Sequence, residues 1–542
     1  MSQSSGDTES NEQGGARFSE DLDSLGKGEL DSAQSVPKQS LHGQDDARSY
    51  SLLDDVLGST DPTGQLRHPS LNDFLSESAV GKALHLWLGT DHHSDKERLV
   101  RRLSRDVATL DSHINDQINK IIHHPRFQKL ESAWRGVEYL VDLAEREYDP
   151  AGSELQIKLL NVTLGELEKD FDGAIEIEQS AIFRKVYENE FGTAGGKPFG
   201  VLIGDYSIKP GPNAGNPHND FSILGYLSQV AAASFCPFIT NASPELFELE
   251  RFGDLVNSSL DHEHTFGRKD YMQWQSLREK EDARFIGLAL PRVLMRKPYT
   301  ESNDRVDGFR FKEQVRENES NGYLWGGAAF AFGGVIAKAF SRSGWLADVR
   351  GVQRNIDDGG LVTDLPLESF STDGAGIAKK FSTDVVISDR LEKELSDVGF
   401  IPLCACYDSP FSAFYSVQSI QKSKVYDTEA ATINARISSM IHTMLCVSRF
   451  AHYLKVIGRD MMGSFKEPEE LEQALHNWIT DYVTADVAAD SETKARYPLR
   501  EASVKVRKVP GKSGVFNSVF HLCPHYEIEG LSAGVRLITE LS

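Results

Sequence analysis

Short apolar runs that alternate with helical segments through residues 150–425 constrain the fold of this chain more than any other feature. Each run is rich in β-branched or other apolar residues and is bounded by turn residues, which is typical of strands. The predicted strands cover residues 155–162, 199–206, 283–290, 383–389 and 399–406, and the predicted helices cover 163–171, 178–190, 221–235 and 326–344. This alternation predicts an α/β fold in which helices cover a sheet.

The last part of the chain, residues 426–542, has a different pattern. Two helices are predicted first, over about 427–457 and 467–484, and three strands follow, over 502–509, 514–522 and 532–541. The sequence PGKSG joins the first two strands and predicts a hairpin turn. This part is therefore expected to be α+β, and its terminal strand is suited to pairing either with its own sheet or with the sheet edge of another chain.

Residues 95–146 carry two apolar stripes at helical spacing. The first stripe consists of Leu99, Leu103, Val107, Leu110, Ile114, Ile118 and Ile121, and the second of Phe127, Leu130, Trp134, Val137, Val141 and Ala144. Between them stands HHP at 123–125, which is expected to break the helix because proline disfavours helix at the residue before it. The two predicted amphipathic helices pack either on each other or on a partner.

The first 60 residues are acidic and poor in apolar side chains, with 12 acidic and 4 basic residues. Residues 1–48 are expected to be disordered because they bury too little apolar surface to offset their ordering entropy. Residues 49–60 differ, since Leu52, Leu53, Val56 and Leu57 lie on one face of a predicted short helix. That helix is either a linear binding motif or a helix that docks on its own domain.

Net charge and cysteine usage exclude several classes of protein. The formal net charge is −23, which argues against a protein that coats nucleic acid or an anionic membrane. No apolar run is long enough to span a membrane, and the first residues lack the pattern of a signal peptide. Five scattered cysteines do not form a disulfide framework, so we expect a reduced, cytoplasmic protein.

Two patterns superficially indicate ligands. The stretch FGTAGGKPFGVLIGDY at 191–206 resembles a phosphate-binding loop, but Phe191 stands where that motif needs glycine and Pro198 where it needs a hydroxyl. Its glycines are expected instead to turn the chain from a helix into a strand. His123 and His124 point about 100° apart on a helix and therefore make a poor metal pair. We expect neither a metal nor another cofactor.

An enzymatic site has weak support. Gly204 and Asp205 are expected near the end of a strand, a common position for catalytic residues in α/β sheets. Arg292 and Arg296 would share one face of a helix and could hold an anion. No nucleophile elbow is present, and structural roles are expected for all of these residues. An α/β enzyme or an anion-binding protein remains the alternative interpretation, with no residue assigned as catalytic.

Several long motifs, in the same order, resemble the large sheath subunit of the bacterial type VI secretion system, the TssC or VipB family. They are IIHHPRFQKLESAWRGVEYLV (121–141), FGTAGGKPFGVLIGDYSI (191–208), CPFITNASPELF (236–247), DARFIGLALPRVLMRKPY (282–299) and NGYLWGGAAFAFGGVIAKAFSRSGWLADVRGV (321–352). Residues 497–541 resemble the C-terminal, gp25-like sheath domain of that family. The resemblance covers about residues 95–541.

The resemblance implies a structural protein without covalent chemistry. Such proteins pair with a small sheath subunit, TssB or VipA, and the pairs stack with other copies as a helical tube around inner-tube hexamers on a baseplate. Contraction of the sheath propels the inner tube, and an AAA+ unfoldase (ClpV-like) recycles the contracted sheath by binding a short N-terminal helix. A related sheath from a phage-like particle is a further alternative.

The resemblance also assigns expected roles along the chain. Residues 147–425 would form the central tail-sheath domain and 426–542 the C-terminal domain. Leu52, Leu53, Val56 and Leu57 would face the unfoldase, while Leu103, Val107, Leu110, Ile114 and Ile118 would contact the small subunit. Val504, Val506, Val535 and Leu537 would lie in strands shared between subunits. Trp134, Tyr323, Trp325 and Trp345 are expected in the core.

Overall fold

The computed structural model describes residues 69–541 apart from internal gaps. These gaps are residues 89–95, 147–154, 194, 213–215, 257–264, 301–308, 310, 316–321, 353–356, 368–380, 407–408, 462–467, 487–488, 509–515, 526, 529–530 and 533–534. The predicted acidic tail (1–48) and the predicted short helix (49–60) lie outside the described residues. The chain divides into two compact units, residues 1–109 and 110–542.

The described part of the first unit is helical. It contains α2 (Pro69–Ser76), α3 (Val80–Leu88) and the beginning of α4 (Lys96–Ile122), which continues into the second unit. Phe74 and Trp87 pack with ring centroids 5.2 Å apart, and the Trp87 indole N–H donates to the buried carboxylate of Asp106 at 3.0 Å. These contacts join α2, α3 and α4 inside this unit.

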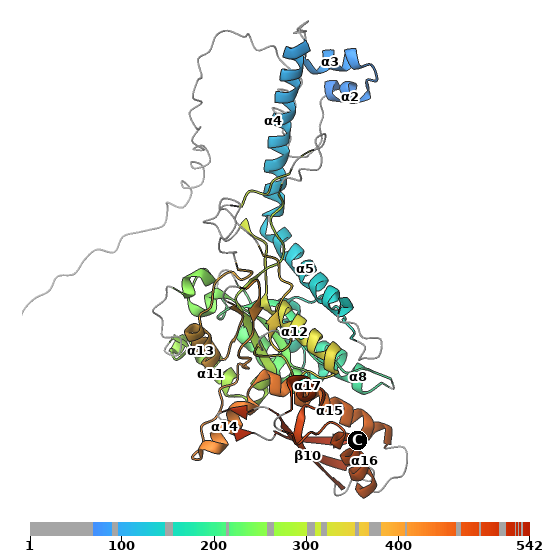
Figure 1. Cartoon of the computed structure of the whole chain (residues 1–542), viewed down its shortest axis with the longest axis vertical. Helices are drawn as coiled ribbons and strands as arrows, with labels where there is room; N and C mark the ends of the chain where they lie inside the picture. Colours follow the sequence, from blue (N-terminus) through green and yellow to red (C-terminus); the bar gives the residue numbers. More distant parts are fainter. Residues whose placement is uncertain are drawn as a thin grey trace, which may run out of the picture. The chain divides into compact units, whose positions relative to one another are not determined.

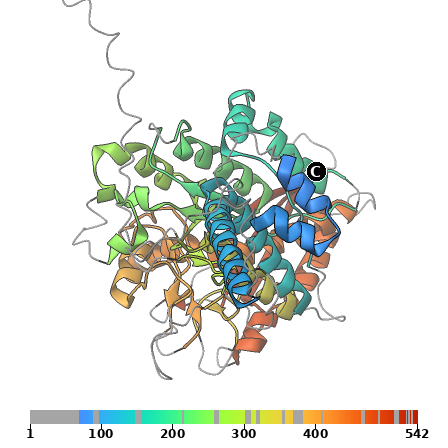
Figure 2. The ribbon, with the colours of Figure 1, turned by 90° about the horizontal axis from the view of Figure 1, so that it is seen from above.

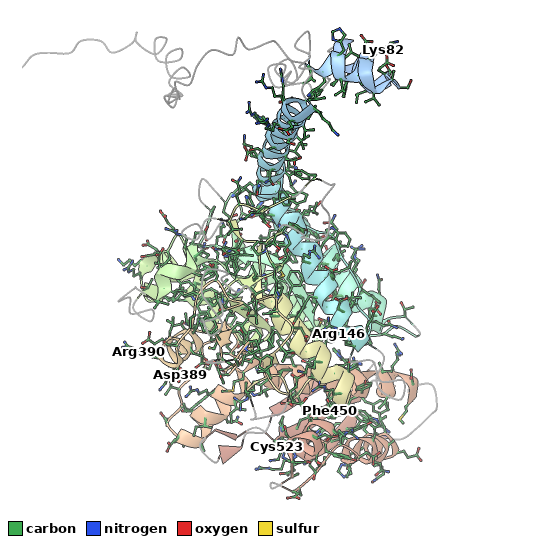
Figure 3. All side chains as sticks on the ribbon, turned by 45° about the horizontal axis from the view of Figure 1, so that its top comes forward. Lys82, Arg146, Asp389, Arg390, Phe450 and Cys523 are labelled. Carbon is green, nitrogen blue, oxygen red and sulfur yellow. The ribbon has the colours of Figure 1, made fainter. Side chains whose placement is uncertain are left out.

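The predicted break after the first apolar stripe is confirmed. Helix α4 ends at Ile122, and α5 (Pro125–Arg146) begins at Pro125. Proline suits the first helical position because its missing N–H would have no intrahelical partner there. At the other end of α5, Arg146, which Figure 3 labels, pairs with Asp364 at 2.9 Å.

The central sheet is parallel and buried on both faces. Its strand order is β1 (Leu202–Ile208), β2 (Phe238–Ala242), β3 (Ile286–Leu290) and β7 (Ile401–Pro402). Alternate residues of β3 belong to different hydrophobic clusters: Leu288 lies in the cluster that includes α9 (Asp220–Ser234), and Ala289 in the cluster that includes α12 (Ala328–Ser343). Helices therefore cover both faces, and the predicted α/β fold is confirmed.

The C-terminal part is built on an antiparallel sheet. Its strand order is β10 (Leu499–Lys508), β11 (Phe516–Pro524) and β14 (Val535–Leu541), and the predicted hairpin between the first two is confirmed by the pairing of Lys508 with Phe516. Helices α15 (Ile441–Met461) and α16 (Pro468–Thr480) contact this sheet. Figure 3 labels Phe450 on α15 and Cys523 on β11 in this region.

One hydrophobic cluster joins the central and C-terminal parts. It includes Leu224 of α9, Trp274, Phe450 of α15 and Phe520 of β11. Within it, the rings of Phe450 and Trp345 stack with centroids 4.0 Å apart. The C-terminal sheet consequently shares a hydrophobic cluster with the α/β part.

The remaining elements are short. The helices are α6 (Leu164–Asp172), α7 (Ala181–Phe183), the π-helix η2 (Arg184–Glu188), α8 (Asn189–Phe191), α11 (Met272–Glu279), α13 (Asp389–Asp397), α14 (Glu429–Ser438) and α17 (Ser491–Arg496). The 3₁₀ turns are η1 (Ile177–Gln179), η3 (Pro244–Phe247), η4 (Phe252–Leu255), η5 (Lys269–Tyr271) and η6 (Glu281–Phe285). The short strands are β4 (Val293–Leu294), β5 (Trp325–Gly326), β6 (Leu361–Val362), β8 (Cys404–Ala405), β9 (Ser412–Ala413), β12 (Glu527–Ile528) and β13 (Leu531–Ser532).

Three predictions about local structure are wrong. Residues 155–162 and 383–389 are not strands, although Val385 and Ile387 are buried in the core. An apolar run indicates that a segment is buried, whereas a strand also needs a neighbouring backbone with which to pair. The predicted helix over about 427–457 is interrupted after α14, where Ser439 is buried and donates its hydroxyl to the Arg436 carbonyl.

Candidate functional site

The candidate anion and catalytic residues are engaged in the fold. Arg292 pairs with Asp384, with its Nε 2.8 Å from the carboxylate, and Arg296 pairs with Glu131 and Glu313. The prediction that the two arginines share a helix face is wrong, because β4 lies between them. Asp205 lies inside β1 and not at its end, and burial raises the pKa of its carboxyl group. This arrangement leaves neither arginine free to bind an anion.

The glycine-rich stretch at 191–206 turns the chain from a helix into a strand, as predicted. Helix α8 ends at Phe191, Gly195 has a φ of 83°, and β1 begins at Leu202. The backbone N–H of Lys197 donates to the Glu190 carboxylate at 2.9 Å, so this amide already has a hydrogen-bond acceptor from its own chain. Among the described residues no group of three or more histidine, cysteine, aspartate or glutamate side chains is placed to hold a metal ion. Nor does any helix in that part of the chain combine the length and apolar character that a membrane span needs.

Helix α5 packs on α12 through small residues. An added Cβ at Gly136 would lie 2.5 Å from the Phe330 ring, and one at Gly334 would lie 2.7 Å from Leu143 and Tyr139. The two helices lie side by side in both views (Figures 1 and 2). Close approach through glycine therefore defines the inner face of α5, which also carries the buried Ser132.

The opposite face of α5 carries the predicted apolar stripe and is exposed. We call this surface, made by Phe127, Leu130, Trp134, Val137 and Val141, the α5 outer face. Trp134 is 62% exposed, so its predicted place in the core is wrong, whereas Tyr323 and Trp345 are buried as predicted and Trp325 is half-buried. A shallow hollow of about 420 Å³ lies over this face, lined by Trp134, Val137 and Val141 together with charged neighbours. A contiguous apolar surface of this kind is typical of a protein interaction site.

The part of α4 that belongs to the second unit is also polar toward its own chain and apolar toward solvent. The Asn115 and Asn119 side-chain oxygens accept from the backbone N–H groups of Lys312 and Gln314 at 3.2 and 2.9 Å. Ile114 and Ile121 are 42% and 58% exposed, and Leu110 and Ile118 are half-buried. A helix with no further partner would bury its isoleucines in preference to its asparagines.

An ion cluster fixes this helix arrangement, and sequence reasoning did not find it. Arg296 donates to Glu131 of α5 and to Glu313, each at 2.6 Å, and His123 lies 3.1 Å from Glu313. The backbone N–H of Tyr299 donates to Glu313 at 2.9 Å. Burial by itself lowers the pKa of Arg296, but the hydrogen bonds to Glu313 and Glu131 outweigh it and raise that pKa. The cluster joins the start of α5 to the segments around residues 296 and 313.

The two other residues predicted to contact a small subunit lie on α4 within the first unit. There Leu103 is half-buried and Val107 is exposed. Both therefore retain apolar surface in the chain alone.

The C-terminal sheet has one blocked edge, at β10, and one edge, at β14, that pairs with no other described strand; we call the latter the open edge. The outer edge of β10 is occupied, because the Leu499 N–H donates to the Tyr482 carbonyl at 3.3 Å and the Val506 N–H donates to Glu472 at 2.9 Å. The side chains of Val504 and Val506 are buried in the chain's own core. In β14, Val535 and Leu537 pair with Leu522 and Phe520 of β11, and no described strand pairs with the other edge of β14.

Comparison with known proteins gives one consistent result. Residues 104–421 match the family described as EvpB/VC_A0108, tail sheath N-terminal domain, and residues 430–541 match its tail sheath gpW/gp25-like domain. The chain is similar to the type VI secretion system sheath protein TssC1 of Pseudomonas aeruginosa. The two are 41% identical over 446 residues, which covers 82% of this chain and 86% of that relative.

Proposed function

The chain belongs to the EvpB/VipB family of tail sheath proteins and is a structural sheath subunit; from this we propose that it is the large subunit of a contractile type VI secretion sheath in the cytoplasm. It pairs with a small sheath subunit (TssB/VipA), and the pairs polymerise around inner-tube hexamers on a baseplate. In this role the chain performs no catalysis and needs no cofactor.

The pairing proposal rests on which faces of α4 and α5 are exposed. Both helices bind their own chain through polar or glycine-containing faces and leave their apolar faces in solvent. In the second unit, Leu110, Ile114 and Ile118 on α4 and the α5 outer face contact the small subunit. In the first unit, Leu103 and Val107 contact the small subunit as well. Burial of this surface supplies the free energy of association.

Self-assembly is assigned to the open edge of the C-terminal sheet. The outer edge of β14, the strand that contains Val535 and Leu537, accepts a strand of a neighbouring subunit. The buried Val504 and Val506 anchor the same sheet to the core. Contacts that repeat without closing generate a helical filament, and contraction is a change between two packings of that filament.

Electron microscopy of the chain co-expressed with its small partner tests this function. We expect hollow tubes from the two chains together and none from either chain alone. Deletion of residues 532–542 is expected to abolish the tubes, because β11 loses the strand with which residues 516–522 pair, while the complex of the two chains is retained. If the intact chains form no tubes, the sheath function is contradicted; if the shortened chain still forms long tubes, the role of β14 is contradicted.

Recycling is assigned to the segment that contains Leu52, Leu53, Val56 and Leu57. These residues form the apolar stripe that a ClpV-like AAA+ unfoldase binds. Leu53→Asp is expected to weaken unfoldase binding at least about tenfold, because a carboxylate would have to be desolvated in an apolar groove. Fluorescence anisotropy with the full chain measures this. Asp54→Asn, on the other side of the predicted helix, is the matched control, and equal affinities for the Leu53→Asp chain and the unaltered chain would contradict the assignment.

A further inference from the structure

Residues 155–162 belong to no helix or strand in the described part of the chain, yet side-chain contacts hold them in place. Within the described part of the chain, the backbone N–H and C=O groups of residues 155–161 have no hydrogen-bond partner. The sequence predicted a strand here, and the side chains have the matching pattern, with Leu155, Ile157 and Leu159 at alternate positions. The segment therefore has the residue pattern of a strand but no paired neighbour in the described part of the chain.

The side chains attach this segment to the rest of the second unit. Leu155 packs against the hydrophobic cluster that contains α12, and the Lys158 ammonium pairs with Glu190 at 2.8 Å and lies 4.9 Å from the centre of the Phe199 ring. At the other end, the Tyr206 hydroxyl donates to the Val162 carbonyl at 2.8 Å. These contacts hold the segment by its side chains and its last carbonyl and leave the preceding backbone groups open.

Apolar side chains on the segment are exposed as well. Leu159 is 64% and Leu160 52% exposed, and Ile157 is also exposed. Exposed leucines beside unpaired backbone groups form an open strand edge, which a protein normally covers or protects with charge. The one charge at its centre, Lys158, is already paired with Glu190 and gives no such protection.

We propose that residues 155–162 form a β-strand with a strand of the small sheath subunit when the two chains pair. This proposal rests on the proposed function and goes beyond it by assigning a second kind of contact to the same partner. A strand of the partner would provide hydrogen-bond partners for the N–H and C=O groups of residues 155–161. Apolar side chains on that partner strand would cover Ile157 and Leu159. The partner is chosen because Leu155 packs on the same cluster as Tyr139 and Leu140 of α5, whose outer face is the proposed contact with the small subunit.

Proline substitution tests the backbone separately from the side chain. In a strand with one new neighbour, every second N–H group points toward that neighbour. Proline has no N–H, so only one of the two variants Leu159→Pro and Leu160→Pro removes a hydrogen bond to the small subunit. We expect one proline variant to weaken formation of the complex at least about tenfold relative to alanine at the same position. Because neither N–H is bonded within the described chain, both variants are expected to melt as the unaltered protein does.

Hydrogen exchange of the unaltered chain provides an independent measurement. Amides in residues 155–162 are expected to exchange rapidly in the chain alone, and alternate amides are expected to slow at least about tenfold in the complex. A complex that forms without slowed exchange here, or two proline variants that both bind normally, would overturn the strand proposal and leave the sheath function standing. Slowed exchange in the chain alone would mean pairing between two copies and would overturn the choice of partner. Failure of the unaltered chains to form any complex would contradict the sheath function itself.

Discussion

Substitution of both Leu110 and Ile114 by aspartate is expected to reduce the affinity for the small sheath subunit at least about 100-fold. Neither side chain is fully buried in the chain alone, since Ile114 is 42% exposed and Leu110 is half-buried. The two carboxylates would be desolvated without a counter-ion in the complex, which costs several kcal/mol, and about 1.4 kcal/mol corresponds to tenfold in affinity. Isothermal titration, or yield in co-purification, measures the loss.

The control for this experiment lies on the same helix. Ser112 and His113 are exposed and stand outside the apolar stripe, so Ser112→Asp with His113→Asp adds the same charge without placing it in the proposed contact. We expect normal affinity for this control and unchanged helix content for both variants. Normal affinity for the Leu110→Asp, Ile114→Asp chain would show that the small subunit binds elsewhere.

Replacement of Arg296 by leucine is expected to destabilise the second unit by about 3–5 kcal/mol. The cation is buried between Glu131 and Glu313, and the side chain of Glu313 is only 1% exposed. Its removal would leave two carboxylates in a low-dielectric site without their cation, which is the costly way to disrupt a buried ion pair. Urea unfolding followed by circular dichroism measures the change in the free energy of unfolding.

Two further variants separate charge from geometry in this cluster. Arg296→Lys retains the charge but loses the planar fork that reaches both carboxylates, so an intermediate loss of stability is expected. Arg390→Leu, outside the cluster, removes an exposed arginine that pairs with Glu394 on its own helix, and it is expected to cost less than about 1 kcal/mol. Equal stabilities for the leucine variants at positions 296 and 390 would contradict the structural role of the cluster.

Sequence reasoning succeeded where the signal is local. The helical spacing of residues 96–146 and the proline at 125 predicted two helices and the break between them, because periodicity and the geometry of proline act within a few residues. The same reasoning predicted strands at residues 155–162 and 383–389, where the structure has none. Pairing depends on which backbone lies alongside, and that neighbour is distant in the sequence or belongs to another chain.

The family, the α/β alternation and the positions of the apolar stripes follow from residue order alone. Which stripe remains exposed depends on contacts between residues that are far apart along the chain. Gly136 approaches Phe330 and thereby turns Trp134 outward, and Arg296 brings together Glu131 and Glu313, which are far apart along the chain. Burial and charge pairing are properties of residues that meet in space, and spacing along the chain does not specify which residues meet.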